Sequence, residues 1–138
     1  MKIYFAAAIS AGRQYAPIYR EIVSELKHNG HTVLTEHVAH PEVVNIEKEI
    51  ADQEIYQRDI QLLLESDLVL AEVSHPSTGV GYEIAYALLN HKPVICTHLK
   101  GLKMSKMITG NIEPLISIHS YESTIELLEN LPGWINRL

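Results

Sequence analysis

The stretch Val69-LAEVSHPSTGVGYEIAYA-Leu88 decides the fold of this chain of 138 residues. The apolar run from Leu68 to Val73 is short and barely alternates with polar residues, as in a strand that is covered on both faces. His75-Pro76-Ser77 ends the strand, because proline cannot donate to a sheet ladder. Apolar residues then return at helical spacing, at Val80, Ile84, Ala87 and Leu88. The stretch therefore predicts a buried strand, a tight turn and a helix.

The turn between this strand and helix has the composition of an anion-binding site. Gly79 and Gly81 let the backbone approach a ligand, and unpaired N–H groups at a helix start attract negative charge. We expect Glu83 in the first helical turn, where the helix dipole favours the ionised carboxylate. One interpretation is a phosphate site beside a nucleophilic carboxylate. In the other, Ser77 merely caps the helix and Glu83 only complements the dipole, and the turn alone leaves both open.

Length and composition favour one globular domain, residues 1–138. Apolar residues make up 46% of the chain and charged residues 20%, and the formal net charge is −6. This negative charge argues against a nucleic-acid polymer as the partner, whereas a small phosphorylated ligand is compatible with it. No apolar run has the length of a membrane span, and the chain starts directly with a predicted strand. We therefore expect a cytoplasmic protein with no membrane partner.

The histidines and the cysteine give no sign of a metal or another cofactor. The sequence has no H-E-x-x-H motif, and no cysteine or carboxylate lies at metal-binding spacing from the two histidine pairs, His28/His31 and His37/His40. Cys96 lies in an apolar run that indicates a buried strand. We expect neither a metal nor a cofactor, and we expect His37, at the end of a predicted strand, to line the site.

Strands and helices alternate along the chain. The predicted strands span residues 2–9, 32–35, 68–73, 93–97 and 114–119. The predicted helices span residues 15–27, 46–66, the segment after Gly79 and 123–131, with loops at 36–45 and 99–110. This alternation predicts an α/β fold, a flavodoxin-like (Rossmann-like) five-stranded parallel sheet with helices on both faces. Ligands bind beyond the carboxyl ends of such strands, so we expect the site near residues 6–13, 36–40, 74–81 and 98–106.

A second carboxylate, Asp59, is expected on the buried side of the predicted helix 46–66. It lies four residues after Ile55 and three before Leu62, on the apolar stripe of that helix. An ionisable group there needs partners or a task, so Asp59 is either a hydrogen-bonded core residue or an acid/base. Two carboxylates at one cleft, one ionised and one partly desolvated, are the usual apparatus for cleaving a glycosidic bond. With a phosphate site beside them, a nucleotide becomes the natural substrate.

Four sequence motifs resemble those of a known family. They are Tyr4-Phe5 followed by Ser10-Ala11-Gly12-Arg13, then Leu34-TEHV-Ala39, then Gln57-Arg58-Asp59, and Ala71-Glu72-Val73 through Pro76-STGVGY-Glu83. In this order they resemble the 2′-deoxynucleoside 5′-phosphate N-hydrolases, which are relatives of the nucleoside 2-deoxyribosyltransferases. The resemblance runs from Lys2 to Gly110.

The resemblance implies a role for each candidate site residue. Glu83 would be the nucleophile that forms a deoxyribosyl-enzyme, Asp59 the acid/base, and Tyr4 the residue that orients Glu83. The 5′-phosphate would be held by Ser77, by N–H groups near Gly79, and by the first loop, residues Ala8, Ile9, Ser10, Ala11, Gly12 and Arg13. Ser105 matches a family serine that reaches the phosphate from a neighbouring subunit, which implies a homodimer.

The first loop departs from the family pattern. Family members often have Gly-Ser at the positions of Ala7-Ala8 and an arginine at the position of Ser10. We expect the nearby Arg13 to compensate for the missing arginine.

These observations lead to one prediction and two alternatives. We expect a retaining N-glycosidase that hydrolyses 2′-deoxynucleoside 5′-monophosphates to free base and 2-deoxyribose 5-phosphate through a covalent glycosyl-Glu83 intermediate. One alternative is a 2-deoxyribosyltransferase acting on unphosphorylated nucleosides, but three serine hydroxyls, those of Ser10, Ser77 and Ser105, suit a phosphate better. The other alternative is a nucleotide-binding sensor without chemistry, for which Asp59 would be surplus.

Overall fold

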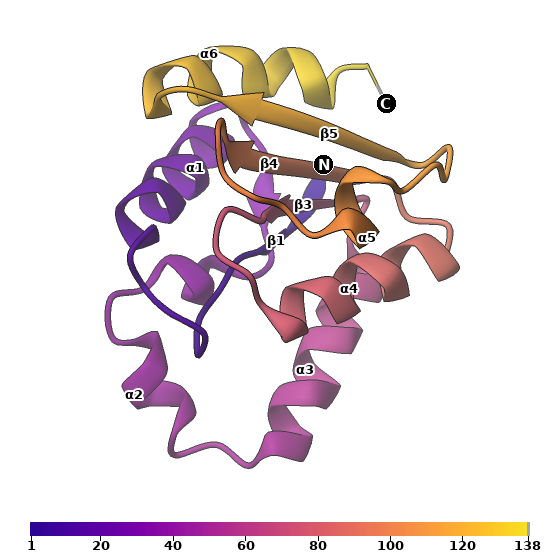
Figure 1. Ribbon diagram of the computed structural model, residues 1–138. Helices are drawn as coiled ribbons and strands as arrows, with labels where there is room; N and C mark the ends of the chain where they lie inside the picture. The colour runs from indigo at the N-terminus through magenta and orange to yellow at the C-terminus, as the bar shows by residue number, and fades with distance from the viewer. Residues whose placement is uncertain (138) are drawn as a thin grey trace.

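A single parallel sheet organises the structure, a computed structural model that describes residues 1–137 (Figure 1). Its strands stand in the order β2-β1-β3-β4-β5. They are β1 (Lys2–Ala6), β2 (Thr32–Val33), β3 (Leu68–Glu72), β4 (Val94–Leu99) and β5 (Ile116–Tyr121). The order changes direction at β1, because β2 lies on one side of it and β3 on the other. The carboxyl ends of β1 and β3 therefore flank the switch point at which such sheets bind ligands.

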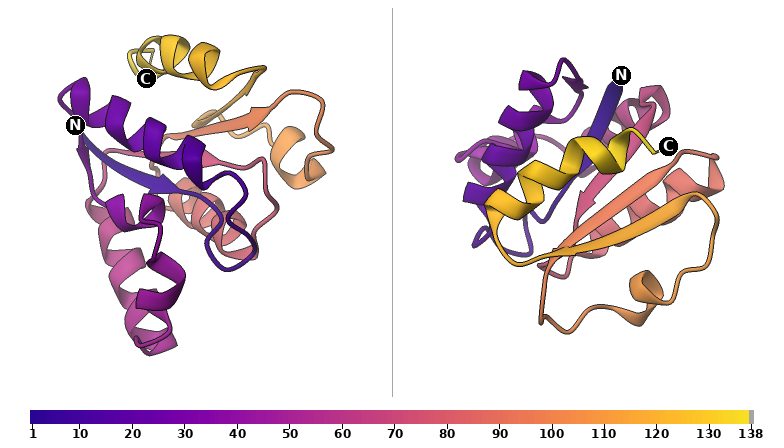
Figure 2. Two further views of the ribbon diagram at one scale, coloured as in Figure 1. Left: turned by 90° about the vertical axis from the view of Figure 1, so that its left-hand side faces the viewer. Right: turned by 90° about the horizontal axis from the view of Figure 1, so that it is seen from above.

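Helices cover both faces of this sheet, as the two views turned by 90° show (Figure 2). Helices α1 (Ala16–His28) and α6 (Thr124–Ile135) pack on one face, in a core that contains Ile3, Phe5 and Leu70. Helices α3 (Asp52–Glu65) and α4 (Thr78–Leu89) cover the other face, in a core that contains Tyr4, Val69 and Ala71. Alternate residues of one strand thus enter different cores, and both cores are apolar because the sheet is buried on both sides. The predicted α/β fold class is confirmed.

The segment before β3 differs from the prediction. Residues 46–66 form two helices, because α2 (Val43–Glu47) ends and α3 begins only at Asp52. Ala51, with φ −65° and ψ 142°, has extended backbone and interrupts the helix, and its carbonyl accepts hydrogen bonds from the N–H groups of Glu54 and Ile55. The predicted loop 36–45 likewise contains a 3-10 helix, η1 (Glu36–Ala39). The apolar spacing of this region predicted one continuous helix because it does not reveal the extended backbone at Ala51.

Smaller differences concern the ends of elements. β1 ends at Ala6 and β2 spans only two residues, whereas β5 begins and ends two residues later than predicted. The predicted loop 99–110 contains the short helix α5 (Lys106–Thr109), and α6 continues through Pro132 to Ile135. Within residues 1–137, none of the helices is both long enough and apolar enough to cross a bilayer.

Candidate active site

Tyr4 and Glu83 meet between β1 and α4. The Tyr4 hydroxyl donates a hydrogen bond of 2.6 Å to Oε1 of Glu83. Glu83 lies in the second turn of α4, since that helix begins at Thr78 after its N-cap Ser77. The expected place in the first turn, with the ionised form favoured by the helix dipole, is therefore wrong. Burial raises the pKa of Glu83 to about 7, although the hydrogen bond from Tyr4 acts to lower it.

Asp59 lies on α3, across from α4, and is paired with a neighbour in its own helix. Arg58 Nε donates to Asp59 Oδ1 over 2.8 Å, and 22% of the Asp59 side chain is exposed. Leu63 is the one fully buried residue of α3, so the first half of the helix extends beyond the sheet (Figure 1). Asp59 therefore lies on the less exposed side of α3, with Ile55, Leu62 and Leu63, as the spacing predicted, but it is half-buried rather than buried. Its negative charge raises the pKa of Glu83, so Asp59 lies within electrostatic reach of that carboxylate.

A third carboxylate, Glu47 at the end of α2, belongs to the same group. Arg58 Nη2 donates to Glu47 Oε1 over 2.8 Å, so one guanidinium bridges Glu47 and Asp59. His37 Nε2 lies 3.9 Å from that same oxygen, and burial followed by the charge of Arg58 lowers the pKa of His37. The sequence motif Gln57-Arg58-Asp59 contains Arg58, but no role was predicted for this residue. Glu47 was missed because α2 and α3 were predicted as one helix.

The first loop is fastened to the turn between β3 and α4. His75 Nε2 lies 2.8 Å from the carbonyl oxygen of Ala11, and the ring lies against Gly12. A Cβ atom on Gly12 would stand 2.8 Å from Cε1 of His75, so only glycine fits there without displacing the ring. The two loops that were predicted to share a phosphate are thus in direct contact.

Arg13 stabilises the first loop through hydrogen bonds to main-chain carbonyls. Its Nη1 donates to the carbonyl of Ala8 over 3.2 Å and its Nη2 to the carbonyl of His40 over 3.1 Å. The guanidinium also lies 5.7 Å from the centre of the Tyr19 ring. Two of the three guanidinium nitrogens thus donate to main-chain carbonyls, and Arg13 links the first loop to the segment at His40. Within the same loop Ala8 is buried, Ile9 is half-buried and Ser10 is exposed.

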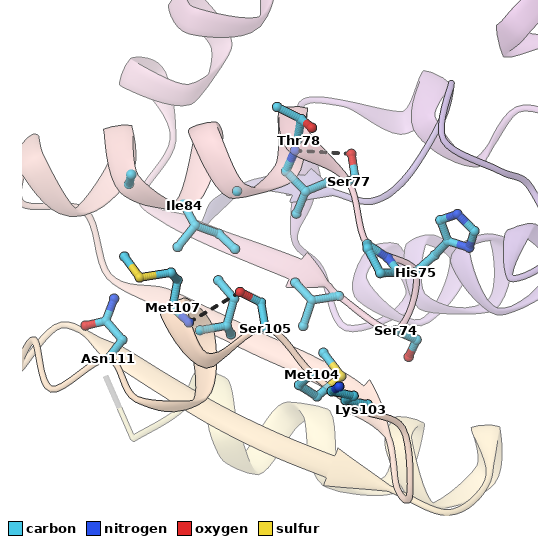
Figure 3. Close-up of a pocket in the computed structure, with 16 residues that line it drawn as sticks. Ser74, His75, Ser77, Thr78, Ile84, Lys103, Met104, Ser105, Met107 and Asn111 are labelled. Carbon is cyan, nitrogen blue, oxygen red and sulfur yellow. Dashed lines mark hydrogen bonds between the residues drawn. The ribbon is translucent and has the colours of Figure 1, made fainter.

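A cavity of about 460 Å³ lies between the start of α4 and the segment from Lys103 to Asn111 (Figure 3). Ser77 caps α4 by accepting from the N–H of Val80 over 3.4 Å, and Ser105 caps α5 by accepting from the N–H of Met107 over 3.3 Å. Both serines line this cavity, whose other walls are mainly apolar. Among the residues that line it are also Gly81, Thr78 and Lys103, but not Gly79.

The structure thus arranges the candidate residues in two adjacent groups. One group of titratable side chains lies around α3 and α4 and consists of Tyr4, Glu83, Asp59 and His37, none of which lines the cavity. The second group consists of two serines, Ser77 and Ser105, whose residues line the cavity on the other side of α4. Helix α4 connects the two groups, since it carries Ser77 at its N-cap and Glu83 in its second turn.

Comparison with known proteins relates the chain to enzymes of nucleotide cleavage and transfer. The chain is 42% identical over 136 residues to a Methanosarcina mazei protein that carries the provisional name 2′-deoxynucleoside 5′-phosphate N-hydrolase 1, covering 99% of this chain and 84% of the relative. It is 40% identical over 126 residues to the 5-hydroxymethyl-dUMP N-hydrolase of Danio rerio, covering 88% and 87%. These names support the expectation of an enzyme of the N-glycosidase type.

Solved structures share the fold at low sequence identity. The CMP N-glycosidase BcmB of Clostridium botulinum superposes with a TM-score of 0.77 at 18% identity, covering 97% of this chain and 99% of that one. A 2-deoxyribosyltransferase of Bacillus psychrosaccharolyticus gives a TM-score of 0.65 at 21% identity, covering 93% and 90%. A family model described as nucleoside 2-deoxyribosyltransferase matches residues 3–123. The chain therefore belongs to the nucleoside 2-deoxyribosyltransferase family, to which its sequence motifs had already pointed.

Proposed function

We propose that the protein hydrolyses the N-glycosidic bond of 2′-deoxynucleoside 5′-monophosphates, giving a free nucleobase and 2-deoxyribose 5-phosphate. The observation that carries this proposal is the Tyr4–Glu83 hydrogen bond, which holds a carboxylate on the helix whose first residues line the serine-bearing cavity. Relatives at about 40% identity that are named N-hydrolases of such nucleotides support it.

In the first step Glu83 acts as the nucleophile. One carboxylate oxygen attacks C1′ of the deoxyribose, while the C1′–N bond breaks and its electron pair goes to the base nitrogen. Asp59 supplies the proton that the departing base takes up. Tyr4 occupies Oε1 of Glu83 and so leaves Oε2 to attack. The product of this step is a glycosyl ester of Glu83 whose sugar still carries its 5′-phosphate.

In the second step water replaces the enzyme at C1′. Asp59, now without its proton, takes one from the water, whose oxygen bonds to C1′ as the ester bond to Glu83 breaks. Two inversions at C1′ give overall retention. Arg58 holds the Asp59 carboxylate by its 2.8 Å hydrogen bond, so the same group is in place for both proton transfers.

The phosphate is proposed to lie at the start of α4. In this proposal the N–H groups near Gly79 and the hydroxyl of the N-cap Ser77 bind the anion, and the helix dipole adds to their attraction. The first loop, residues 8–13, would cover the phosphate on the side where His75 contacts the carbonyl of Ala11 and so links the loop to the turn. Ser105 is proposed to contribute its hydroxyl, either from the same chain, in whose cavity it lies, or from the second subunit of a homodimer.

Transfer of a deoxyribosyl group between bases is the second candidate function. It is favoured by the family model and by the fold of a 2-deoxyribosyltransferase, and it would use the same two carboxylates. The serine hydroxyls at the cavity favour a phosphate over a free 5′-hydroxyl and hence the hydrolase. A sensor without chemistry would leave the buried Tyr4–Glu83 pair without a task.

The test is to incubate the protein with deoxynucleoside monophosphates, with the matching nucleosides and with ribonucleotides, and to separate the free bases. The expected result is release of base and 2-deoxyribose 5-phosphate from the deoxynucleotides, at a rate far above the release of base from the nucleosides and the ribonucleotides. Base exchange in mixtures of a nucleoside and a second base would instead establish the transferase. In Asp59→Asn, a deoxynucleotide of 7-methylguanine, whose base departs without protonation, should still form the ester, and slow hydrolysis of that ester should allow intact mass spectrometry to detect the glycosyl group on Glu83. Glu83→Gln is the control in which no adduct forms.

A further inference from the structure

Glu72 is a fully buried carboxylate that the proposed reaction does not use. It is the last residue of β3 and has no exposed surface. Leu70, two residues earlier, belongs to the core under α1 and α6, and side chains alternate along a strand, so Glu72 also points to that face. Glu83 lies on α4 at the opposite face. Glu72 is therefore separated from the reacting atoms by the sheet itself.

Three donors surround this carboxylate. The N–H of Ser74 donates over 3.2 Å, the Ser74 hydroxyl donates a short hydrogen bond, and the Tyr121 hydroxyl donates over 2.8 Å. Burial raises the pKa of Glu72, whereas these donors lower it. A buried ionisable group is costly, and an apolar residue at such a position is often at least as stable. The retention of a carboxylate here calls for a reason other than stability.

Ser74 connects Glu72 to the cavity. It is the first residue of the turn that leads to Ser77, and it lines the cavity itself. Its hydroxyl also accepts a hydrogen bond of 2.8 Å from the N–H of Leu99, the last residue of β4. Ser105 is carried by the segment that follows Leu99. Through one serine, Glu72 therefore ties together the two segments that carry the cavity's hydroxyls.

We propose that Glu72 is a positioning residue for recognition of the 5′-phosphate. It fixes the turn before α4 through Ser74 and the end of β4 through Leu99, so that Ser77 and Ser105 keep their places at the cavity. A carboxylate suits this task because it accepts from all three donors at once. A glutamine would direct its NH₂ group at one or more of them, and the Ser74 N–H is unable to turn round and accept. This inference rests on the proposed function, since a phosphate must be the group that is recognised.

The experiment compares a deoxynucleoside monophosphate with its nucleoside in wild type, Glu72→Leu and Glu72→Gln. Glu72→Leu is expected to raise KM for the nucleotide about tenfold or more, the equivalent of one charge-assisted hydrogen bond, with kcat little changed. Activity on the nucleoside should stay near the wild-type level. Glu72→Gln should restore part of the nucleotide affinity, because its carbonyl still accepts from the Ser74 N–H. Equal losses on both substrates, or an unchanged nucleotide KM, would overturn the proposal.

Ser74→Ala serves as a second variant if Glu72→Leu does not fold. It keeps the buried carboxylate and the Ser74 N–H, but removes the hydroxyl that donates to Glu72 and accepts from the Leu99 N–H. It should therefore raise the nucleotide KM in the same direction. Combined with Ser77→Ala, its effect should be clearly less than additive, because both changes act on one turn; strict additivity would contradict the positioning role. Calorimetric binding of the nucleotide separates the two proposals. If wild type binds it without turnover, the hydrolase proposal fails, and the effect of Glu72→Leu on binding still decides the role of Glu72.

Discussion

The hydroxyl of Tyr4 lies 2.6 Å from Oε1 of Glu83, across a sequence separation of 79 residues. The contact joins β1, where the strand order changes direction, to the second turn of α4. Burial raises the pKa of both groups, in Tyr4 with the help of the Glu83 charge. The tyrosine therefore stays a donor at neutral pH, and its hydrogen bond limits how far the pKa of Glu83 rises. Access of Glu83 to its ionised form thus depends on Tyr4.

Tyr4→Phe should move the pH dependence of activity. A nucleophilic Glu83 must be ionised, so wild-type kcat/KM is expected to rise with pH through about 7. Loss of the donor raises the pKa of Glu83, by about one to two units for a hydrogen bond to a charged group. The midpoint of the kcat/KM profile should therefore move to higher pH, with the largest loss of rate at and below pH 7. Tyr82→Phe, an exposed tyrosine of the same helix, is the control; an unchanged midpoint in Tyr4→Phe would refute the coupling.

Glu83→Gln should abolish turnover and make the protein more stable at alkaline pH. The folded-state pKa of Glu83, about 7, exceeds its ordinary value of 4.5, so the native state binds more protons than the unfolded state between these values. The free energy of unfolding of the wild type therefore falls as pH rises through this window, by about 3 kcal/mol, which is the free-energy equivalent of the pKa shift. Glutamine carries no charge and keeps an acceptor for Tyr4. The Tm of the variant minus that of wild type should be larger at pH 8 than at pH 5, and a pH-independent difference would contradict this explanation.

Asp59→Asn should slow the departure of the base. Loss of a general acid typically costs about 10²–10⁴ in rate, and the cost shrinks when the leaving group needs no proton. A deoxynucleotide of 7-methylguanine, whose base departs without protonation, should therefore be cleaved by the variant far better than a natural purine nucleotide. Arg58→Gln is the matched comparison, because it removes the partner of Asp59 and keeps the carboxylate. If both substrates lose rate equally in Asp59→Asn, the acid role is wrong.

The sequence predicted the sheet and its ligand-binding edge because strand, turn and helix signals agree over residues 68–88. It misplaced the electrostatics of Glu83. Ser77 caps α4 and starts the helix at Thr78, so Glu83 falls one turn deeper than expected, where burial outweighs the dipole. A preference for a cap is visible in sequence, but the burial of a side chain six residues later depends on what packs against it. Here the group that packs against it is Tyr4, from a distant strand.

Glu47 illustrates the other limit of sequence reasoning. Apolar spacing runs smoothly from Ile46 to Leu63, and nothing in it marks the extended backbone of Ala51. The break allows α2 to lie against η1 and allows Glu47 to reach Arg58. Contacts between α2 and α3 therefore depend on a local backbone choice that tertiary packing decides. The bridge that Arg58 forms between Glu47 and Asp59 depends on this backbone conformation, and the apolar periodicity of the sequence does not predict it.

The last prediction concerns which subunit supplies Ser105. In a homodimer with shared sites, Ser105→Ala removes a hydroxyl from the partner's site, whereas Glu83→Gln inactivates its own. Each variant alone should be impaired: Glu83→Gln without turnover, and Ser105→Ala with nucleotide binding weaker by about 1.5–3 kcal/mol and nucleoside binding unchanged. A mixed dimer then contains one site with both Glu83 and Ser105 intact. Coexpression with two tags and purification of the mixed species should recover a site with the wild-type nucleotide KM. If Ser105 acts within its own chain, as its place beside Ser77 in one cavity allows, every active site in the mixture lacks its hydroxyl and the KM stays high.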